Sequence, residues 1–340
     1  MFLQSLATAF PAHSFTQHEC LAILRDSGAM AGLKQRSCDL LGKILTGNSG
    51  IETRHFCDPD LPKVFRYDAG ELHRHFEHHA PRLAADALVR ACNQAAVQPA
   101  EIDALLICTC TGYLCPGLSS YVSERLGLRP NAFLQDLLGL GCGAALPLLE
   151  TARGVLAANP DALVATVAVE ISSAAFYLND EPGVLISLCL FGDGAAAALW
   201  RSTDQGRQFR FHNFQTLHDP AHREKIRFVN ANGRLKNQLH RDVPALAADA
   251  VARLYENRTA TPDHLIAHTG GRDVIEAIEH KIPGERLSET REILRRYGNV
   301  SSPCVLAALE VSLQTHPDSS HLWMTAFGAG FSAHSAELTR

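Results

Sequence analysis

A continuous apolar run in the middle of the chain constrains the fold more than any other feature. Leu163 to Val169 reads Leu-Val-Ala-Thr-Val-Ala-Val, so apolar side chains fall on both faces of any strand that it forms. Such a strand must be covered on both sides, as in proteins whose helices pack on both faces of a sheet. The run therefore predicts a layered α/β fold.

Strand and helix patterns alternate along the rest of the chain. Further strands are predicted at four apolar runs, Ile102–Cys108, Ala196–Trp200, His264–His268 and Leu322–Thr325. Helical spacing predicts helices over Pro81–Ala96, Ala145–Ala158 and Ala245–Tyr255, and another from Val274. At 340 residues the chain exceeds the usual size of one core, and its composition becomes polar after residue 200. We expect two rigidly packed halves, 1–200 and 201–340.

Charge and composition exclude several classes of function. The net charge of −5 gives no reason to expect a nucleic-acid partner or stable association with an anionic membrane. The first ten residues lack the pattern of a signal peptide, and no apolar stretch is long enough to span a bilayer. The ten cysteines are then expected to be reduced thiols, and the protein to be cytoplasmic.

Two clusters of potential metal ligands occur in the sequence. Cys108 and Cys110 lie in an apolar run without zinc-ribbon spacing, so we interpret them as structural or pocket-lining thiols. Four histidines, His73, His75, His78 and His79, fall in an expected surface helix from Glu71 to Ala80. His75 and His79 are four residues apart, which suits a metal, but the sequence shows no acidic or cysteine partner. A solvated helix face is the preferred interpretation, and no metal is expected.

Three chemically distinctive residues occur in glycine-punctuated turns: Cys142, His268 and Asn299. Cys142 precedes an amphipathic helix, whose N-terminal dipole favours a thiolate. An imidazole and a side-chain amide form a pair of donors for a thioester oxyanion or an enolate. The sequence therefore predicts acyl-transfer chemistry at a cysteine.

Several segments, in this order, resemble the type III polyketide synthases, the chalcone and stilbene synthase family of thiolase-fold enzymes. They are Cys108–Tyr113 with Pro116-Gly117, Gly141-Cys142, Leu190–Ala196, His268-Thr269-Gly270-Gly271, Gly298–Ser302 and Ala326–Gly330. The resemblance implies two similar halves, each with a five-stranded sheet, stacked as an αβαβα sandwich. It also implies a homodimer that uses acyl-CoA and malonyl-CoA and needs no cofactor.

The resemblance implies a role for each member of the trio. Cys142 would take an acyl group from CoA, and His268 with Asn299 would bind the thioester carbonyl of malonyl-CoA. Loss of CO2 leaves an enolate that attacks the acyl-enzyme, and extension and cyclisation give a pyrone, resorcinol or phloroglucinol-type product. Phe191 would gate the junction between the CoA tunnel and the cavity.

Matching of segments also implies a set of pocket residues. Those expected to line the cavity are Cys110, Thr111, Ser172, Ala175, Ser187 and Ser301. Gly328 and Gly330 resemble a glycine loop that shapes the cyclisation cavity. Cys115 falls where the family sends a residue across the dimer interface, and a buried structural thiol is the other interpretation.

Two departures from the family pattern concern gating and CoA binding. Asn237 stands where the family has a second aromatic residue. The cationic triplet that plant members use for CoA phosphates is not reproduced, and Lys43 and Arg54 are the nearby candidates.

Three alternatives remain open at this stage. A 3-oxoacyl-[acyl-carrier-protein] synthase III shares the fold and the Cys-His-Asn set but performs one condensation. A hydrolase of papain type uses the same three residue types, with the histidine as general base. A relative without catalytic activity would bind acyl-CoA or a partner enzyme.

Overall fold

The apolar run that predicts a buried strand forms β6 (Val164–Glu170), and all of its residues are buried. The computed structural model describes residues 1–204, 206 and 209–340. In it, β6 pairs in parallel with β4 (Ala104–Cys108) and antiparallel with β7 (Gly194–Arg201). The layered α/β interpretation is confirmed.

The strands of the first half form one part of a nine-stranded sheet in the described residues. Their order is β5 (Phe133–Leu137), β4, β6, β7 and β1 (Phe2–Ala9). The second half continues with β8 (Arg210–His218), β13 (Ser332–Thr339), β12 (His321–Gly328) and β11 (His264–Ala267). A single pair, Phe2 with Arg210, joins β1 to β8. In the described part of the chain the second half thus contributes four strands to this sheet, where five were expected.

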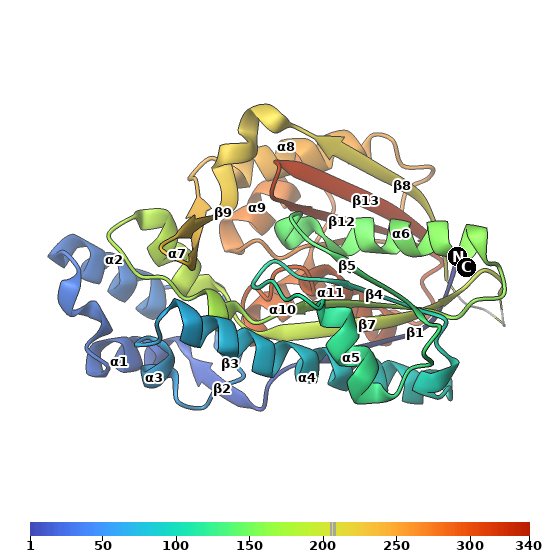
Figure 1. Cartoon of the computed structure of the whole chain (residues 1–340). Helices are drawn as coiled ribbons and strands as arrows, with labels where there is room; N and C mark the ends of the chain where they lie inside the picture. The colour runs from blue at the N-terminus through green and yellow to red at the C-terminus, as the bar shows by residue number, and fades with distance from the viewer. Residues whose placement is uncertain (205, 207–208) are drawn as a thin grey trace.

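Helices cover both faces of each half, which gives the expected αβαβα arrangement (Figure 1). Two helices lie between the halves, α6 (Ala145–Ala158) and α11 (Cys304–Thr315), and their side chains share one core with strands of both. Outer helices of the first half are α4 (Ala69–Ala95) and α5 (Leu118–Leu126). Those of the second half are α8 (Val243–Tyr255), α9 (Arg272–Lys281) and α10 (Ser288–Tyr297). The division at residue 200 stays a prediction.

One helix was wrongly predicted as two. The sequence suggested a surface helix that ends at Ala80 and a second helix that begins at Pro81, but α4 runs through Pro81 without interruption. Proline in a helix interior costs about 3 kcal/mol. Here the apolar residues on both sides of it, including Phe76, Ala80 and Ala84, are buried in one cluster against the sheet. The free energy gained by burying this continuous apolar face outweighs the cost of the proline.

A smaller group of helices and strands packs at the end of the molecule that holds the candidate active site. It comprises β2 (His13–Thr16), β3 (Thr53–Phe56), α1 (Gln17–Asp26), α2 (Gln35–Thr46), α3 (Leu61–Val64) and α7 (Pro182–Leu190). A two-stranded ribbon of β9 (Ile226–Ala231) and β10 (Arg234–Leu239) packs against α7. Within the described residues, no helix combines the length and apolar character needed to cross a membrane. All ten cysteines are free thiols.

Candidate active site

Cys142 lies in a 3-10 turn, Gly141–Gly143, that leads directly into α6. The thiol is buried, with 8% of the residue exposed. The turn packs closely on the end of β12, where a Cβ atom on Gly328 would lie 2.5 Å from the backbone nitrogen of Gly143 and from the Leu140 carbonyl oxygen. Gly328 therefore supports the cysteine turn from behind, and it does not line the cavities described below. The expectation that it shapes the cyclisation cavity stays a prediction.

His268 and Asn299 lie in loops of the second half. His268 follows β11, and its backbone N–H donates to the Thr325 carbonyl of β12 over 2.9 Å. The side-chain oxygen of Asn299 accepts from the backbone N–H of Ser301 over 2.8 Å. Its amide nitrogen donates to the Gly270 carbonyl over 3.3 Å, which leaves one of its two N–H groups for another acceptor. The amide is thus fixed with its nitrogen toward the loop that follows His268.

Cys142, His268 and Asn299 line one cavity of about 630 Å³. Phe191 lines the same cavity, and its backbone forms an isolated bridge with that of Asn299. Across this bridge the Asn299 N–H donates to the Leu190 carbonyl over 2.8 Å, and the Gly192 N–H donates to the Asn299 carbonyl over 3.1 Å. The structure therefore brings together the predicted trio and the predicted gate.

Burial opposes the charged forms of both the thiol and the imidazole. It raises the pKa of Cys142 to about 12 and lowers the pKa of His268 to about 3. Loss of hydration in this enclosed site opposes the helix dipole, which favours a thiolate, and the resting thiolate stays a prediction. Burial disfavours a Cys142 thiolate or a His268 imidazolium that forms alone. When a proton passes from Cys142 to His268, the two opposite charges form together and attract each other.

Ser301 contacts the nucleophile from a strained backbone conformation. Its φ of 58° is in the left-handed region, which a residue with a Cβ atom seldom adopts. The hydroxyl donates to Cys142 Sγ over 3.2 Å, and Cys110 Sγ lies 3.3 Å from the same oxygen. Strain of this kind persists where the surroundings hold a residue in place for function. The hydroxyl partly offsets the effect of burial on the Cys142 pKa.

Glu170 is a buried polar residue next to the site that sequence reasoning missed. It ends β6 and has no exposed surface. Its carboxylate accepts from the Thr111 hydroxyl and the Cys110 N–H, both over 2.9 Å, and from the Ser302 hydroxyl over 2.6 Å. Burial raises its pKa, and these donors oppose the rise. The available signal was a carboxylate at the end of an otherwise apolar strand.

Most of the other predicted pocket residues surround a small hollow of about 30 Å³ beside the main cavity. Its lining includes Cys110, Thr111, Ser172, Ala175, Ser187, Phe191 and Ser301. Asn237 lines it as well and donates to the Ser187 hydroxyl over 3.0 Å. Directly opposite Asn237 in the β9–β10 ribbon stands Phe228, which lines both this hollow and the main cavity. An aromatic side chain is therefore present at this wall, one strand away from its expected place.

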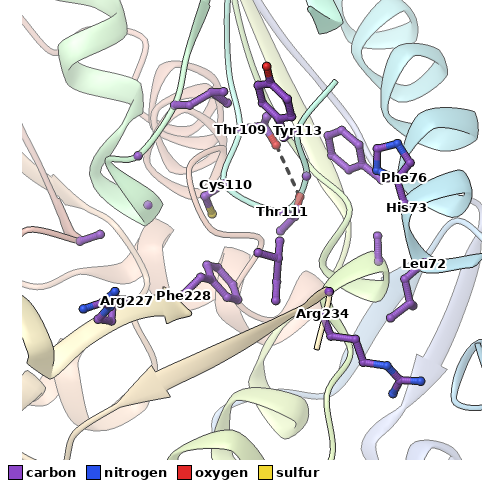
Figure 2. Close-up of a pocket in the computed structure, with 18 of the residues that line it drawn as sticks. Leu72, His73, Phe76, Thr109, Cys110, Thr111, Tyr113, Arg227, Phe228 and Arg234 are labelled. Atoms are coloured by element: carbon purple, nitrogen blue, oxygen red, sulfur yellow. Dashed lines mark hydrogen bonds between the residues drawn. The ribbon is translucent and has the colours of Figure 1, made fainter. Parts of the chain in front are cut away.

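A third cavity, of about 790 Å³, opens on the other side of Cys110 (Figure 2). Figure 2 shows Cys110 and Thr111 between the ribbon, which contributes Arg227, Phe228 and Arg234, and helix α4, which contributes Leu72, His73 and Phe76. Gly330 lines this cavity and not the one that holds Cys142.

The two cationic candidates for CoA lie in different environments. Lys43 is exposed and lines the main cavity. Arg54 is 3% exposed, and its guanidinium donates to the Gln17 side chain and to the Leu188 and Phe191 carbonyls. It lines none of the three cavities described here, so the expectation that it contacts CoA is corrected. Sequence reasoning missed three other cations at the main cavity, Arg227, Arg241 and Arg272.

Two family models match the chain. The model of FAE1/type III polyketide synthase-like proteins matches residues 9–257. The model of the C-terminal domain of chalcone and stilbene synthases matches residues 222–320. Together they include Cys142, His268 and Asn299.

Similar proteins agree with this assignment over nearly the full chain. A 1,3,6,8-tetrahydroxynaphthalene synthase of Streptomyces griseus is 28% identical over 313 residues, which is 89% of this chain and 82% of that protein. A phloroglucinol synthase of Pseudomonas fluorescens is 25% identical over 341 residues, covering 96% and 95% of the two chains. The crystal structure of 1,3,6,8-tetrahydroxynaphthalene synthase from Streptomyces coelicolor shares the fold, with a TM-score of 0.88, 23% identity, and coverage of 100% of this chain and 99% of that one. The chain therefore belongs to the type III polyketide synthase family and is an acyltransferase, not a carrier-protein synthase or a hydrolase.

Proposed function

We propose that Cys142 carries the growing acyl chain and that His268 and Asn299 activate malonyl-CoA. The observation that carries this proposal is the placement of a thiol, an imidazole and an oriented amide on one cavity of about 630 Å³. Thiol, base and oxyanion donors are the parts that acyl transfer through a thioester requires.

The first step loads the starter. When an acyl-CoA enters, the proton of Cys142 passes to His268 and the sulfur attacks the thioester carbonyl. The Ser301 hydroxyl stabilises the thiolate through its 3.2 Å contact with Sγ. CoA leaves as a thiol, and the acyl group remains on Cys142.

The second step extends the chain. The thioester carbonyl of malonyl-CoA accepts from the His268 ring and the Asn299 amide, so that charge develops on its oxygen as CO2 leaves. Removal of one such donor typically costs two to three orders of magnitude in rate. The enolate carbon attacks the acyl-enzyme carbonyl, and a carbon–carbon bond forms as the C–S bond to Cys142 breaks. The extended chain is then a thioester of CoA, and the freed Cys142 sulfur takes it back with release of CoA thiol. Repetition followed by cyclisation gives a pyrone, resorcinol or phloroglucinol-type product. Relatives named for tetrahydroxynaphthalene and phloroglucinol support an aromatic product.

CoA binding and assembly extend this proposal. The exposed Lys43, with Arg241 and Arg272, would contact the CoA phosphates at the mouth of the main cavity. A second copy of the chain would cover the large exposed hydrophobic residues Tyr113, Phe133 and Leu138. No cofactor is required for these steps, and ten free thiols suit a cytoplasmic location.

Mass spectrometry of products and of the acyl-enzyme tests the division of roles. The wild-type protein is incubated with malonyl-CoA and a panel of short, long and aromatic acyl-CoAs. Cys142→Ala is expected to lose acyl transfer while it retains a residual malonyl decarboxylase activity. Asn299→Ala is expected to form the acyl-enzyme but to lose decarboxylation. Absence of an acyl-enzyme in a folded Asn299→Ala variant would contradict the proposed roles.

A further inference from the structure

Two of the four clustered histidines meet a carboxylate that the sequence did not place beside them. His75 and His79 lie one turn apart on α4, and Asp58 lies in the loop between β3 and α3 (Figure 1). One ligand atom from each of the three residues lies within 4.8 Å of the others. His75 is 6% exposed, so the interpretation of this face as solvated is wrong for it.

The hydrogen bonds around His75 fix which ring nitrogen carries the proton. The Asp193 carboxylate accepts from the backbone N–H groups of Ser173 and Cys57. Because an ionised carboxylate has no proton to give, the Ser173 hydroxyl is the donor in its 2.8 Å hydrogen bond to Asp193 Oδ2. The single hydroxyl proton of Ser173 is thereby used. His75 Nε2, 2.9 Å from the same oxygen, must then be the donor. Its Nδ1 therefore carries the lone pair that a metal ion needs.

This arrangement matches the outer contacts of known metal sites. A histidine ligand almost always donates its second ring nitrogen to an oxygen acceptor, which orients the ring. The Asp58 carboxylate is oriented too, since it accepts from the Asp60 N–H over 2.8 Å and from the Tyr67 hydroxyl over 3.3 Å. Burial lowers the pKa of both His75 and His79 to about 4, so neither ring holds a proton that a metal would have to displace near neutral pH.

We propose that Asp58, His75 and His79 form a binding site for one divalent transition metal ion of the zinc class. Two imidazoles and one carboxylate suit Zn²⁺, Co²⁺ or Ni²⁺, whereas Mg²⁺ and Ca²⁺ select oxygen ligands. A separation of up to 4.8 Å between ligand atoms is wider than the roughly 3.4 Å edge of a tetrahedron with 2.0–2.1 Å bonds, so binding would draw the three side chains together. Water completes the coordination.

The site would connect the β3–α3 loop to the wall of the catalytic cavity. Ser173 lies next to Ser172, which lines the small hollow, and Asp193 lies two residues after Phe191. A bound ion would hold His75 against Ser173 and so stabilise the segment that carries these residues. The role of the ion would be structural, because it touches no reacting atom.

Cobalt titration of tag-free protein tests the site. Chelator-treated enzyme is titrated with Co²⁺ and followed by visible absorption, and Zn²⁺ is then added in competition. The variants are His79→Gln and Asp58→Asn, both at half-buried positions. Matched controls are His78→Gln on the same helix and Asp60→Asn in the same loop, because free thiols and exposed histidines also bind these ions.

We expect one equivalent of Co²⁺ to bind the wild type and both controls, with imidazole-type spectra and a rise in Tm when Zn²⁺ is added. Ser173→Ala should weaken binding by about 10–100-fold, as for other outer contacts. His79→Gln and Asp58→Asn should weaken it by more than that. Equal affinity in all variants, or no bound ion in the wild type, would overturn the proposal without touching the polyketide synthase assignment, which a product assay of the same samples reads separately.

Discussion

Gly328→Ala should disable acyl transfer although residue 328 lines none of the cavities described here. The added Cβ would lie 2.5 Å from the Gly143 nitrogen and the Leu140 carbonyl oxygen, and 3.0 Å from the Cys142 nitrogen. Ordinary contacts begin at 3.4 Å. Relief therefore requires a shift of roughly 0.9 Å between β12 and the cysteine turn. Since β12 is paired on both edges, by β11 and β13, the turn must give way.

A displacement of about 1 Å at a reacting group costs on the order of 100-fold in rate. We expect that loss in the single-turnover rate of Cys142 acylation, read by mass spectrometry, and a stability loss of about 1–3 kcal/mol from overpacking. Gly154→Ala is the matched control, since its Cβ would meet nothing within 4 Å in α6 and should add about 0.5–1 kcal/mol. Acylation by Gly328→Ala within a few-fold of wild type would refute the reasoning.

Three further predictions test the surroundings of the site. Ser301→Ala should slow alkylation of Cys142 at a fixed neutral pH by about 10–100-fold, because loss of a hydrogen bond to the sulfur raises the thiol pKa further. The alkylation rate is read on the peptide that contains Cys142, and an unchanged dependence of this rate on pH would contradict the prediction. Lys43→Ala should raise KM for acyl-CoA a few-fold with no change in Tm. Arg54→Ala should instead lower Tm, because the Leu188 and Phe191 carbonyls lose their donor. A raised KM without a change in Tm for Arg54→Ala would indicate that Arg54 is a CoA ligand. Burial lowers the pKa of His334 from 6.5 to about 4 in the folded protein. Between pH 4 and 6.5 residue 334 is therefore protonated in the unfolded chain and neutral in the folded one, so the free energy of unfolding falls as the pH drops through this range. In urea unfolding across that range His334→Gln should reduce the slope by about 1.4 kcal/mol per pH unit, and an unchanged slope would show that His334 is not the titrating group.

Local pattern was sufficient for elements whose burial is uniform. β6 and β4 are buried throughout, and the helix predicted at Ala145–Ala158 has those bounds in the structure. β13 gave no such signal, because its residues read as polar although seven of the eight are buried. Its Glu337 accepts from the Asn213 amide and from Thr259 and His321, residues far away in sequence. A polar strand in the middle of a sheet is stable only with such partners, which no local window reveals.

The same distinction separates the predicted and missed parts of the site. Cys142, His268 and Asn299 stand in glycine turns whose order is visible in the sequence, and one cavity contains all three. The raised pKa of Cys142 and the buried carboxylate of Glu170 depend on packing by several elements. The place of Phe228 depends on strand register, because Phe228 faces Asn237 only through the pairing of β9 with β10.

The two central helices together give the fold an electrostatic property that neither half has by itself. α6 begins just after Cys142, and α11 begins just after Ser301, so the N-terminal ends of one helix from each half meet at the same cavity. Each such end carries about half a positive charge. The thiolate and the enolate of decarboxylative condensation are both anions, and a pair of converging positive ends would attract the negative charge on the sulfur as well as on the enolate oxygen. The two halves differ in side-chain chemistry, one bearing the thiol and the other the imidazole and amide, while each supplies a helix end of the same polarity.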